Sequence, residues 1–219
     1  DARTGACAMT VRVINLGLPK TGTTTLGVAL DRAGLVVADF KLRRGSCPDR
    51  RIAGSFVARQ LYDGYFRSGD PLERLGSIDA LTEISVLNGT LCLWPQTDFG
   101  LIEALRHHHP AIRFVASWRD PAETAHSMLR WSDLGTRRLP QGNIPGLPSG
   151  YGETRLERAQ WVAQHYAFLR RIFAGDTRFL EYDTADPQAP EMLSAHPGIT
   201  LPWWGKANEN RSMRSVDTP

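Results

Sequence analysis

The chain of 219 residues lacks any apolar run close to the roughly 20 residues that a membrane-spanning helix requires. It also lacks a short hydrophobic segment of the secretory type before Val11. Cysteine is scarce, because only Cys7, Cys47 and Cys92 are present, an odd number without the spacing of a metal site. We therefore expect reduced thiols, a cytoplasmic location and no membrane span.

A strong excess of one charge is absent as well. The 26 basic and 23 acidic side chains leave a formal net charge of +3 and a pI near 8.9. This balance is too even for a nucleic-acid-binding protein, so we expect no nucleic-acid partner, although it slightly favours an anionic ligand. The hydrophobic content of 42% is that of an ordinary globular protein.

We expect one domain over residues 9–219. Met9 precedes the first apolar segment, so residues 1–8 are interpreted as an extension outside the fold. Residues 134–152 contain five Gly and three Pro in nineteen positions, too many helix- and strand-breaking residues for a regular element. Such a segment inside a compact domain is more often a lid or a binding loop than a passive connection.

Apolar periodicity predicts strands that alternate with helices. The expected strands cover 11–16, 35–38, 77–85, 112–118 and 178–182, and the expected helices cover 24–33, 52–66, 97–107, 121–131 and 153–173. In the last helix, Leu156, Val162 and Tyr166 are expected on the buried face, and an irregular tail follows the last strand. This order is typical of a three-layer α/β/α fold around a mostly parallel sheet that begins with a right-handed βαβ unit.

The segment Asn15–Thr25 (NLGLPKTGTTT) is the most informative part of the sequence. It follows an apolar strand and opens a helix, so backbone N–H groups and the positive end of the helix dipole converge on one phosphate-sized position. Gly17 and Gly22 keep the glycine spacing of the Walker nucleotide-binding loop, G-x-x-x-x-G-K-[ST]. Thr23 stands where that loop has its lysine, and the lysine of this segment, Lys20, lies inside the loop.

A second motif begins about a hundred residues later, after the expected strand 112–118. Arg119 follows that strand, Asp120 has the position of a helix N-cap, and Glu123 has the capping-box position. Ser127 lies two helical turns beyond the cap, on a helix face that can turn back toward the strand end. Arginine offers a planar, permanently charged fork for a phosphate group, and serine offers a short neutral donor.

These two motifs resemble those of the sulfotransferase family, in particular its small bacterial members. The 5′-phosphosulfate loop of the family reads Pro-Lys-[Ser/Thr]-Gly-Thr-Thr, and Pro19–Thr24 matches it here. Arg119 and Ser127 match the residues with which the family binds the 3′-phosphate of its donor. The resemblance implies the donor 3′-phosphoadenosine 5′-phosphosulfate and in-line transfer of its sulfuryl group to a hydroxyl or an amine of a small-molecule or carbohydrate acceptor.

The resemblance also implies roles for the first loop. Lys20 is expected to stabilise the charge that develops on the bridging oxygen of the leaving phosphate. The 5′-phosphate is expected to be held by the side chains and backbone amides of the residues after that lysine, namely Thr21, Gly22, Thr23, Thr24 and Thr25.

The general base for the acceptor is expected beside the third strand. Residues 79–85 (DALTEIS) resemble an Asp-Ala-Phe-[Ser/Thr]-Asp-Ile-Pro segment of small bacterial relatives, with Glu83 at the second acidic position. A carboxylate at the carboxyl end of a strand would point into the active cleft, and partial burial would raise its pKa. Glu83 is therefore our hypothesis for the base, and Asp79 and His126 stay open as alternatives.

The tail contributes a weaker resemblance. Residues 201–210 are similar to C-terminal segments of bacterial relatives. The Trp that stacks on adenine in cytosolic members is Thr25 here, so Trp203 or Trp204 is expected either to stack on the base or to close the edge of the core. Lys206 is expected to reach the 3′-phosphate.

The acceptor side of the site is inferred only in outline. The basic loop 41–51 and the Gly/Pro-rich segment 134–152 are expected to frame it. Their arginines suit an anionic or polyhydroxylated acceptor, and nearby aromatic residues suit a phenol or a sugar ring; these residues are Arg43, Arg44, Arg137, Arg138, Trp94, Trp131 and Tyr151. Alternatively, the arginines only decorate a solvated surface.

Two other functions compete with sulfuryl transfer. A kinase with a related loop is disfavoured, because the lysine after the second glycine is missing and no predicted strand obviously ends in an Asp that could hold magnesium. A catalytically silent module would keep the nucleotide site without turnover. The triplet His107–His109 does not indicate a metal site, because consecutive residues on a helix do not share a face, and we predict no metal.

Overall fold

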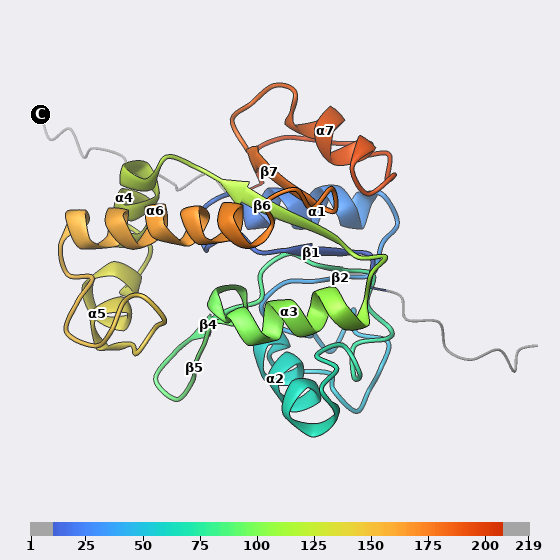
Figure 1. Ribbon diagram of the computed structural model, residues 1–219, viewed down its shortest axis with the longest axis horizontal. Coiled ribbons are helices and arrows are strands. Elements are labelled where there is room, and N and C mark those ends of the chain that lie inside the picture. Colours follow the sequence, from blue (N-terminus) through green and yellow to red (C-terminus); the bar gives the residue numbers. More distant parts are fainter. Residues whose placement is uncertain (1–10, 208–219) are drawn as a thin grey trace, which may run out of the picture.

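The computed structural model describes residues 11–207, and its centre is a five-stranded parallel sheet (Figure 1). In spatial order the strands are β2 (Val37–Ala38), β3 (Ala80–Leu81), β1 (Val13–Asn15), β6 (Arg113–Trp118) and β7 (Phe179–Asp183). Every pairing in this sheet is parallel. The predicted α/β class is therefore confirmed. Residues 1–8, Met9, Cys7 and the end of the tail lie outside the described residues.

Helices cover both faces of the sheet and complete the three predicted layers. Helices α1 (Thr23–Arg32) and α7 (Ala189–Ala195) pack on one face, and α2 (Val57–Ser68), α3 (Phe99–His108), α4 (Pro121–Leu129) and α6 (Arg155–Ile172) pack on the other. Side chains along β6 alternate between the two faces, so that Phe114 and Ala116 join the larger core and Val115 joins the smaller one. The sheet is therefore buried on both sides.

The order of the strands determines where a ligand can enter. After β1 the chain runs through α1 to the edge strand β2, and β3 then lies between β2 and β1. The later strands β6 and β7 are added on the other side of β1. The direction of winding thus reverses between β1 and β6, and ligands of such sheets bind outside the carboxyl ends of the strands at this point.

The prediction that residues 134–152 are irregular is wrong for the first half of that segment. Residues Leu134–Arg138 form a turn of π-helix and Leu139–Gln141 form a turn of α-helix. Four apolar side chains of the segment are buried in the larger core: Leu134, Leu139, Ile144 and Leu147. Gly135 allows this packing, because a Cβ there would lie 2.7 Å from the Cα of Leu129 in α4. Burial of these side chains outweighs the breaker-rich composition.

The last long helix is confirmed, but one of its predicted core residues is not. Helix α6 begins at a capping box of Thr154 and Glu157. Leu156 is 76% exposed, whereas Arg158 is 1% exposed. The Arg158 guanidinium donates to the carbonyl oxygens of Gly152 at 2.7 Å and Glu153 at 2.8 Å. These bonds satisfy the charged group inside the fold, which periodicity alone does not anticipate.

Short elements were missed by the prediction. Strands β4 (Val86–Leu87) and β5 (Cys92–Leu93) pair to form a hairpin. Helix α7 occupies part of the tail that was expected to be irregular. The two-residue strands are too short to show a period.

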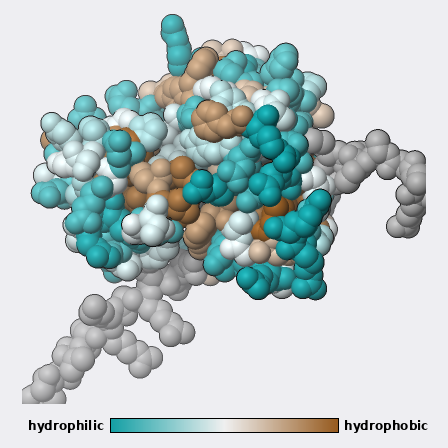
Figure 2. Space-filling model, turned by 90° about the horizontal axis from the view of Figure 1, so that it is seen from below, coloured by the Kyte–Doolittle hydropathy of each residue, from teal (hydrophilic) through white to brown (hydrophobic). Residues whose placement is uncertain are grey.

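No helix within residues 11–207 has the length and apolarity to span a membrane. The face in Figure 2 is mostly hydrophilic, with smaller hydrophobic patches between the polar side chains.

Candidate functional site

A cavity of about 840 Å³ lies at the carboxyl ends of β1, β6 and β7, where the winding reverses. Its walls come from the loop after β1, the segment after β3, the start of α4, the loop after β7 and the tail. Of the predicted site residues, all but Thr21 line it: Lys20, Gly22, Thr23, Thr24, Thr25, Glu83, Arg119, Ser127 and Lys206. Segments almost two hundred residues apart in the sequence therefore meet at one cavity.

Asn15, at the end of β1, holds the floor of this region together. Its side-chain nitrogen donates to Thr82 O at 2.8 Å and to Ser117 Oγ at 3.2 Å. Its side-chain oxygen accepts from the backbone N–H groups of Gly17 and Ser117, each at 3.0 Å. The side chain is fully buried, so these four bonds tie the ends of β1, β3 and β6 in one satisfied network.

Two glycines of the loop are required by close contacts. A Cβ on Gly17 would lie 2.6 Å from the carbonyl oxygen of Ser117. Gly22 has a φ of 98°, and a Cβ there would lie 2.3 Å from Cγ2 of Thr184, in the loop after β7. Lys20 also has a positive φ, 75°, which is uncommon for a residue with a side chain. The loop therefore holds its lysine in a backbone conformation that only the surrounding contacts maintain.

Thr21 faces the protein interior rather than the cavity. Its hydroxyl donates to Leu18 O at 2.6 Å and lies 2.9 Å from Ser117 Oγ. The hydroxyl of Tyr166, from α6, donates to Ser117 O at 2.6 Å and accepts from Leu18 N at 3.3 Å. The side chain of Thr21 thus braces the loop from inside, and only its backbone remains available to a ligand.

Glu83 lies at the cavity wall, just after the carboxyl end of β3. The hydroxyl of Thr23 donates to its Oε2 at 3.1 Å. Burial raises the pKa of Glu83 to about 7, and the hydrogen bond from Thr23 and the charge of Lys20 only partly oppose that rise. A carboxyl group with this pKa can take up a proton near neutral pH.

Lys20 is partly desolvated at the same wall. Burial lowers its pKa, the negative charge of Glu83 opposes this, and the positive charge of Arg119 reinforces it. Its ammonium nitrogen lies 4.7 Å from the centre of the Trp131 ring, within the range of a cation–π contact. The cation therefore lies against an aromatic face at the cavity, within the electrostatic influence of Glu83.

Arg119, directly after β6, and Ser127, on α4, also line the cavity. Asp120 caps α4 by accepting from Glu123 N at 2.9 Å. The Glu123 side chain does not complete a capping box; instead it accepts from Arg119 Nε at 3.0 Å. This ion pair is exposed, so it contributes little free energy and a stronger anion can replace it.

Neither alternative base lies at the cavity. Asp79 precedes β3, so it sits at the amino end of the sheet, where its carboxylate accepts from Val36 N at 2.8 Å. His126 is exposed on α4 and is not part of the cavity lining. Among the three candidates, the geometry therefore favours Glu83.

The tail folds back onto α1 and closes one side of the cavity. Ala207 N lies 3.5 Å from Thr25 Oγ1. Trp204 lines the cavity and packs edge-to-face against Tyr182, with 6.1 Å between ring centres. Trp203 instead packs under Arg32, whose guanidinium carbon lies 4.6 Å from the ring centre. Of the two tryptophans, Trp204 is thus the one beside the cavity, and part of the predicted segment, after Ala207, lies outside the described residues.

The predicted acceptor frame is only partly present. The loop 41–51 and the segment 134–152 do not line the large cavity. Arg43 pairs with Asp39, and Arg137 pairs with Asp133. Of the three aromatic candidates, Trp131 lines the large cavity, Trp94 is 2% exposed in the core, and Tyr151 lines a separate pocket. His109 pairs with Asp70 at 2.6 Å and ends helix α3.

Sequence reasoning missed the loop after β7. Asp183, Thr184 and Ala185 line the cavity, and Thr184 lies against Gly22 of the first loop. An acidic residue that ends a predicted strand is a usable pattern, because carboxyl ends of parallel strands share one edge. No sequence pattern indicates that the hydroxyl of Tyr166 supports the first loop, since a tyrosine on a helix usually packs in the core.

Comparison with models of known protein families gives no match, and no curated protein matches the chain.

Proposed function

We propose that the protein is a sulfotransferase that moves a sulfuryl group from 3′-phosphoadenosine 5′-phosphosulfate to a hydroxyl of a small-molecule or carbohydrate acceptor. The observation that carries this proposal is the meeting of both predicted donor-binding motifs at one cavity, with Lys20 and Glu83 on the same wall. A volume of about 840 Å³ has room for a nucleotide and part of an acceptor.

The donor would lie across the point where the winding reverses. Backbone amides at the start of α1 and the hydroxyls of Thr23 and Thr24 would hold its 5′-phosphate. Arg119 would exchange Glu123 for the 3′-phosphate, and Ser127 would add a neutral donor. Trp204 supplies an aromatic face for the adenine ring, beside Lys206.

In the transfer step, the bond between sulfur and the bridging oxygen breaks as the acceptor oxygen attacks sulfur in line. Glu83 takes the proton of the acceptor hydroxyl, which its pKa of about 7 permits near neutral pH. The electron pair of the broken bond stays on the phosphate oxygen, and the ammonium of Lys20 stabilises that charge. The products are a sulfate ester and adenosine 3′,5′-bisphosphate.

A phosphoryl-transfer function has one observation in its favour. Strand β7 ends in Asp183, and this carboxylate lines the cavity near the first loop, where a magnesium nucleotide would need it. However, Asp183 Oδ1 already accepts from Ala185 N at 2.8 Å, and Thr23 stands in place of the Walker lysine. We therefore rank this function second.

Calorimetric titration with adenosine 3′,5′-bisphosphate, 5′-AMP and Mg-ATP tests the proposal. We expect the bisphosphate to bind at least about tenfold more tightly than 5′-AMP, because hydrogen bonds to charged groups contribute about 1.5–3 kcal/mol. Arg119→Ala should remove that preference, whereas Arg130→Ala, at the C-cap of α4 and outside the cavity lining, should keep it. Tight binding of Mg-ATP without any benefit from the 3′-phosphate would reject sulfuryl transfer in favour of a kinase.

Turnover distinguishes the enzyme from a silent module. Incubation with the labelled donor and a panel of phenols, amines and sugars should release adenosine 3′,5′-bisphosphate in an acceptor-dependent manner. Glu83→Gln should bind the bisphosphate normally and lose turnover. Normal binding with no turnover by the wild type on the whole panel would favour the silent module.

A further inference from the structure

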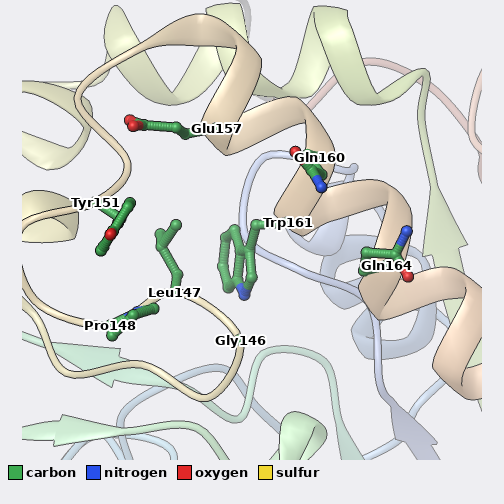
Figure 3. Close-up of a pocket in the computed structure, with 8 residues that line it drawn as sticks. All are labelled: Gly146, Leu147, Pro148, Tyr151, Glu157, Gln160, Trp161 and Gln164. Carbon is green, nitrogen blue, oxygen red and sulfur yellow. The ribbon is translucent and has the colours of Figure 1, made fainter.

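A second pocket lies apart from the large cavity and shares no lining residue with it (Figure 3). It has a volume of about 230 Å³ and lies between helix α6 and the loop 146–151. We propose that this pocket binds a single neutral sugar ring, independently of the sulfuryl donor. The size suits one ring with substituents, because a cavity of about 150 Å³ accommodates benzene.

One wall of the pocket is apolar and aromatic. Tyr151, Leu147 and Trp161 follow one another across the pocket in Figure 3. Tyr151 is 55% exposed, so much of its ring is open to a ligand, and Trp161 and Leu147 form the buried floor. The C–H groups on one face of a sugar ring carry a slight positive charge, and they pack favourably on the negative face of an aromatic ring.

The other wall presents polar groups from successive turns of α6. Gln160 and Gln164 are both exposed, and each amide offers a donor and an acceptor. Within residues 11–207 no hydrogen bond to either side chain is found. Glu157 adds a carboxylate oxygen, Oε1, beyond the Oε2 that caps the helix. Sugar hydroxyls are both donors and acceptors, so they can pair with amide and carboxylate groups of this kind.

The charge of the pocket selects against anions. None of its eight lining residues is basic, and backbone N–H groups of Thr154 and Gly152 lower the pKa of Glu157, which keeps it ionised at neutral pH. A sugar acid would therefore meet an unpaired like charge. A quaternary ammonium ion would suit the carboxylate and Tyr151 but would leave the amides of Gln160 and Gln164 without partners.

The pocket is formed before any ligand binds. Trp161 Nε1 donates to Pro145 O at 3.1 Å, and Gly152 N donates to Glu157 Oε2 at 3.0 Å, so the loop is attached to α6 at both ends. Gly146 lies over the indole, because a Cβ there would be 3.3 Å from Trp161 Cδ1. A preformed site avoids the entropy cost of ordering a loop around a small ligand.

Ligand-observed and ¹⁵N-indole NMR of the full chain with methyl glucoside, methyl galactoside, glucuronate and tetramethylammonium tests this site. We expect saturable binding of a neutral glycoside, with a shift of the Trp161 indole resonance. Gln160→Ala and Gln164→Ala should each weaken it about fivefold, the effect of losing about 1 kcal/mol of hydrogen bonding. Leu156→Ala, on an exposed position of the same helix outside the pocket, should leave binding unchanged.

Three outcomes would overturn the assignment. They are no saturable binding of either glycoside, stronger binding of glucuronate or tetramethylammonium than of the glycosides, and glycoside binding that both Gln variants leave unchanged. The test uses no nucleotide, so its result does not depend on whether the large cavity binds the sulfuryl donor.

Discussion

Asp79 and Glu83 stand at opposite ends of the same short strand, β3, and their surroundings differ. At the amino end, Asp79 accepts a hydrogen bond from Val36 N at 2.8 Å. At the carboxyl end, Glu83 accepts one from Thr23 Oγ1 at 3.1 Å and is desolvated strongly enough for its pKa to rise to about 7.

The glycines near the two ends differ in the same way. A Cβ on Gly17, after the carboxyl end of β1, would collide with Ser117, whereas a Cβ on Gly76, before β3, would meet no atom within 4 Å. There is thus space for a side chain at position 76, near the amino end, whereas position 17, at the carboxyl end, is closely packed. Parallel strands produce this asymmetry, because they bring all their carboxyl ends to one edge.

The largest expected effect comes from removing the network beneath the cavity. Asn15→Leu keeps the number and branching of the side-chain heavy atoms but leaves the buried N–H groups of Gly17 and Ser117 without acceptors. We expect a loss of about 3 kcal/mol or more in the free energy of unfolding, since each unsatisfied group costs about 1–3 kcal/mol. Urea unfolding measures it, and a loss below about 1 kcal/mol would show that other groups replace these bonds.

The second effect depends on pH. Unfolded Glu83 titrates near its ordinary pKa of 4.5 and folded Glu83 near 7, so the folded state binds the extra proton between these values. The contribution of Glu83 to the free energy of unfolding is fully present below pH 4.5. It is lost as the pH rises through 7, by up to about 3 kcal/mol. Glu83→Gln should therefore be progressively more stable than the wild type as the pH rises.

Denaturant unfolding at a series of pH values checks this sign. The surface variant Glu191→Gln should follow the wild-type curve, since Glu191 is exposed. A Glu83→Gln curve parallel to that of the wild type would mean that Glu83 has an ordinary pKa and no special fitness as a base.

The third effect compares the glycines directly. Gly17→Ala places a methyl group 2.6 Å from a backbone oxygen that cannot move freely, so we expect a loss of about 2 kcal/mol from overpacking. Gly76→Ala should change stability by no more than about 0.5 kcal/mol. Thermal unfolding should separate the two by several degrees. Equal melting temperatures would remove the contrast in packing between the two ends.

The smallest effect is expected at the amino end. Asp79→Ala removes a single hydrogen bond to Val36 N, so stability should fall by about 1 kcal/mol. Binding of adenosine 3′,5′-bisphosphate should not change, because Asp79 is remote from the cavity lining. Calorimetry on the variant checks this, and weaker binding would show that the two ends are coupled.

Much of the fold could be predicted because local patterns and tertiary packing agree. The apolar runs and helix caps located β1, α1, β6, α4 and α6 to within a few residues. The prediction was wrong for residues 134–141, where burial of Leu134 and Leu139 outweighs the breaker residues, and for Leu156, where a buried Arg158 takes the inner position.

The sequence by itself determined the alternation of strands and helices, the glycine- and threonine-rich turn after the first strand, and the capped helix after Arg119, because each depends on neighbouring residues. Only the tertiary structure decided the strand order, the four-bond role of Asn15, the approach of Thr184 to Gly22 and the return of the tail to Thr25. These contacts join residues far apart in the chain, and no local propensity specifies them. The raised pKa of Glu83 belongs to the second group, because desolvation is set by what the whole fold packs around a carboxylate.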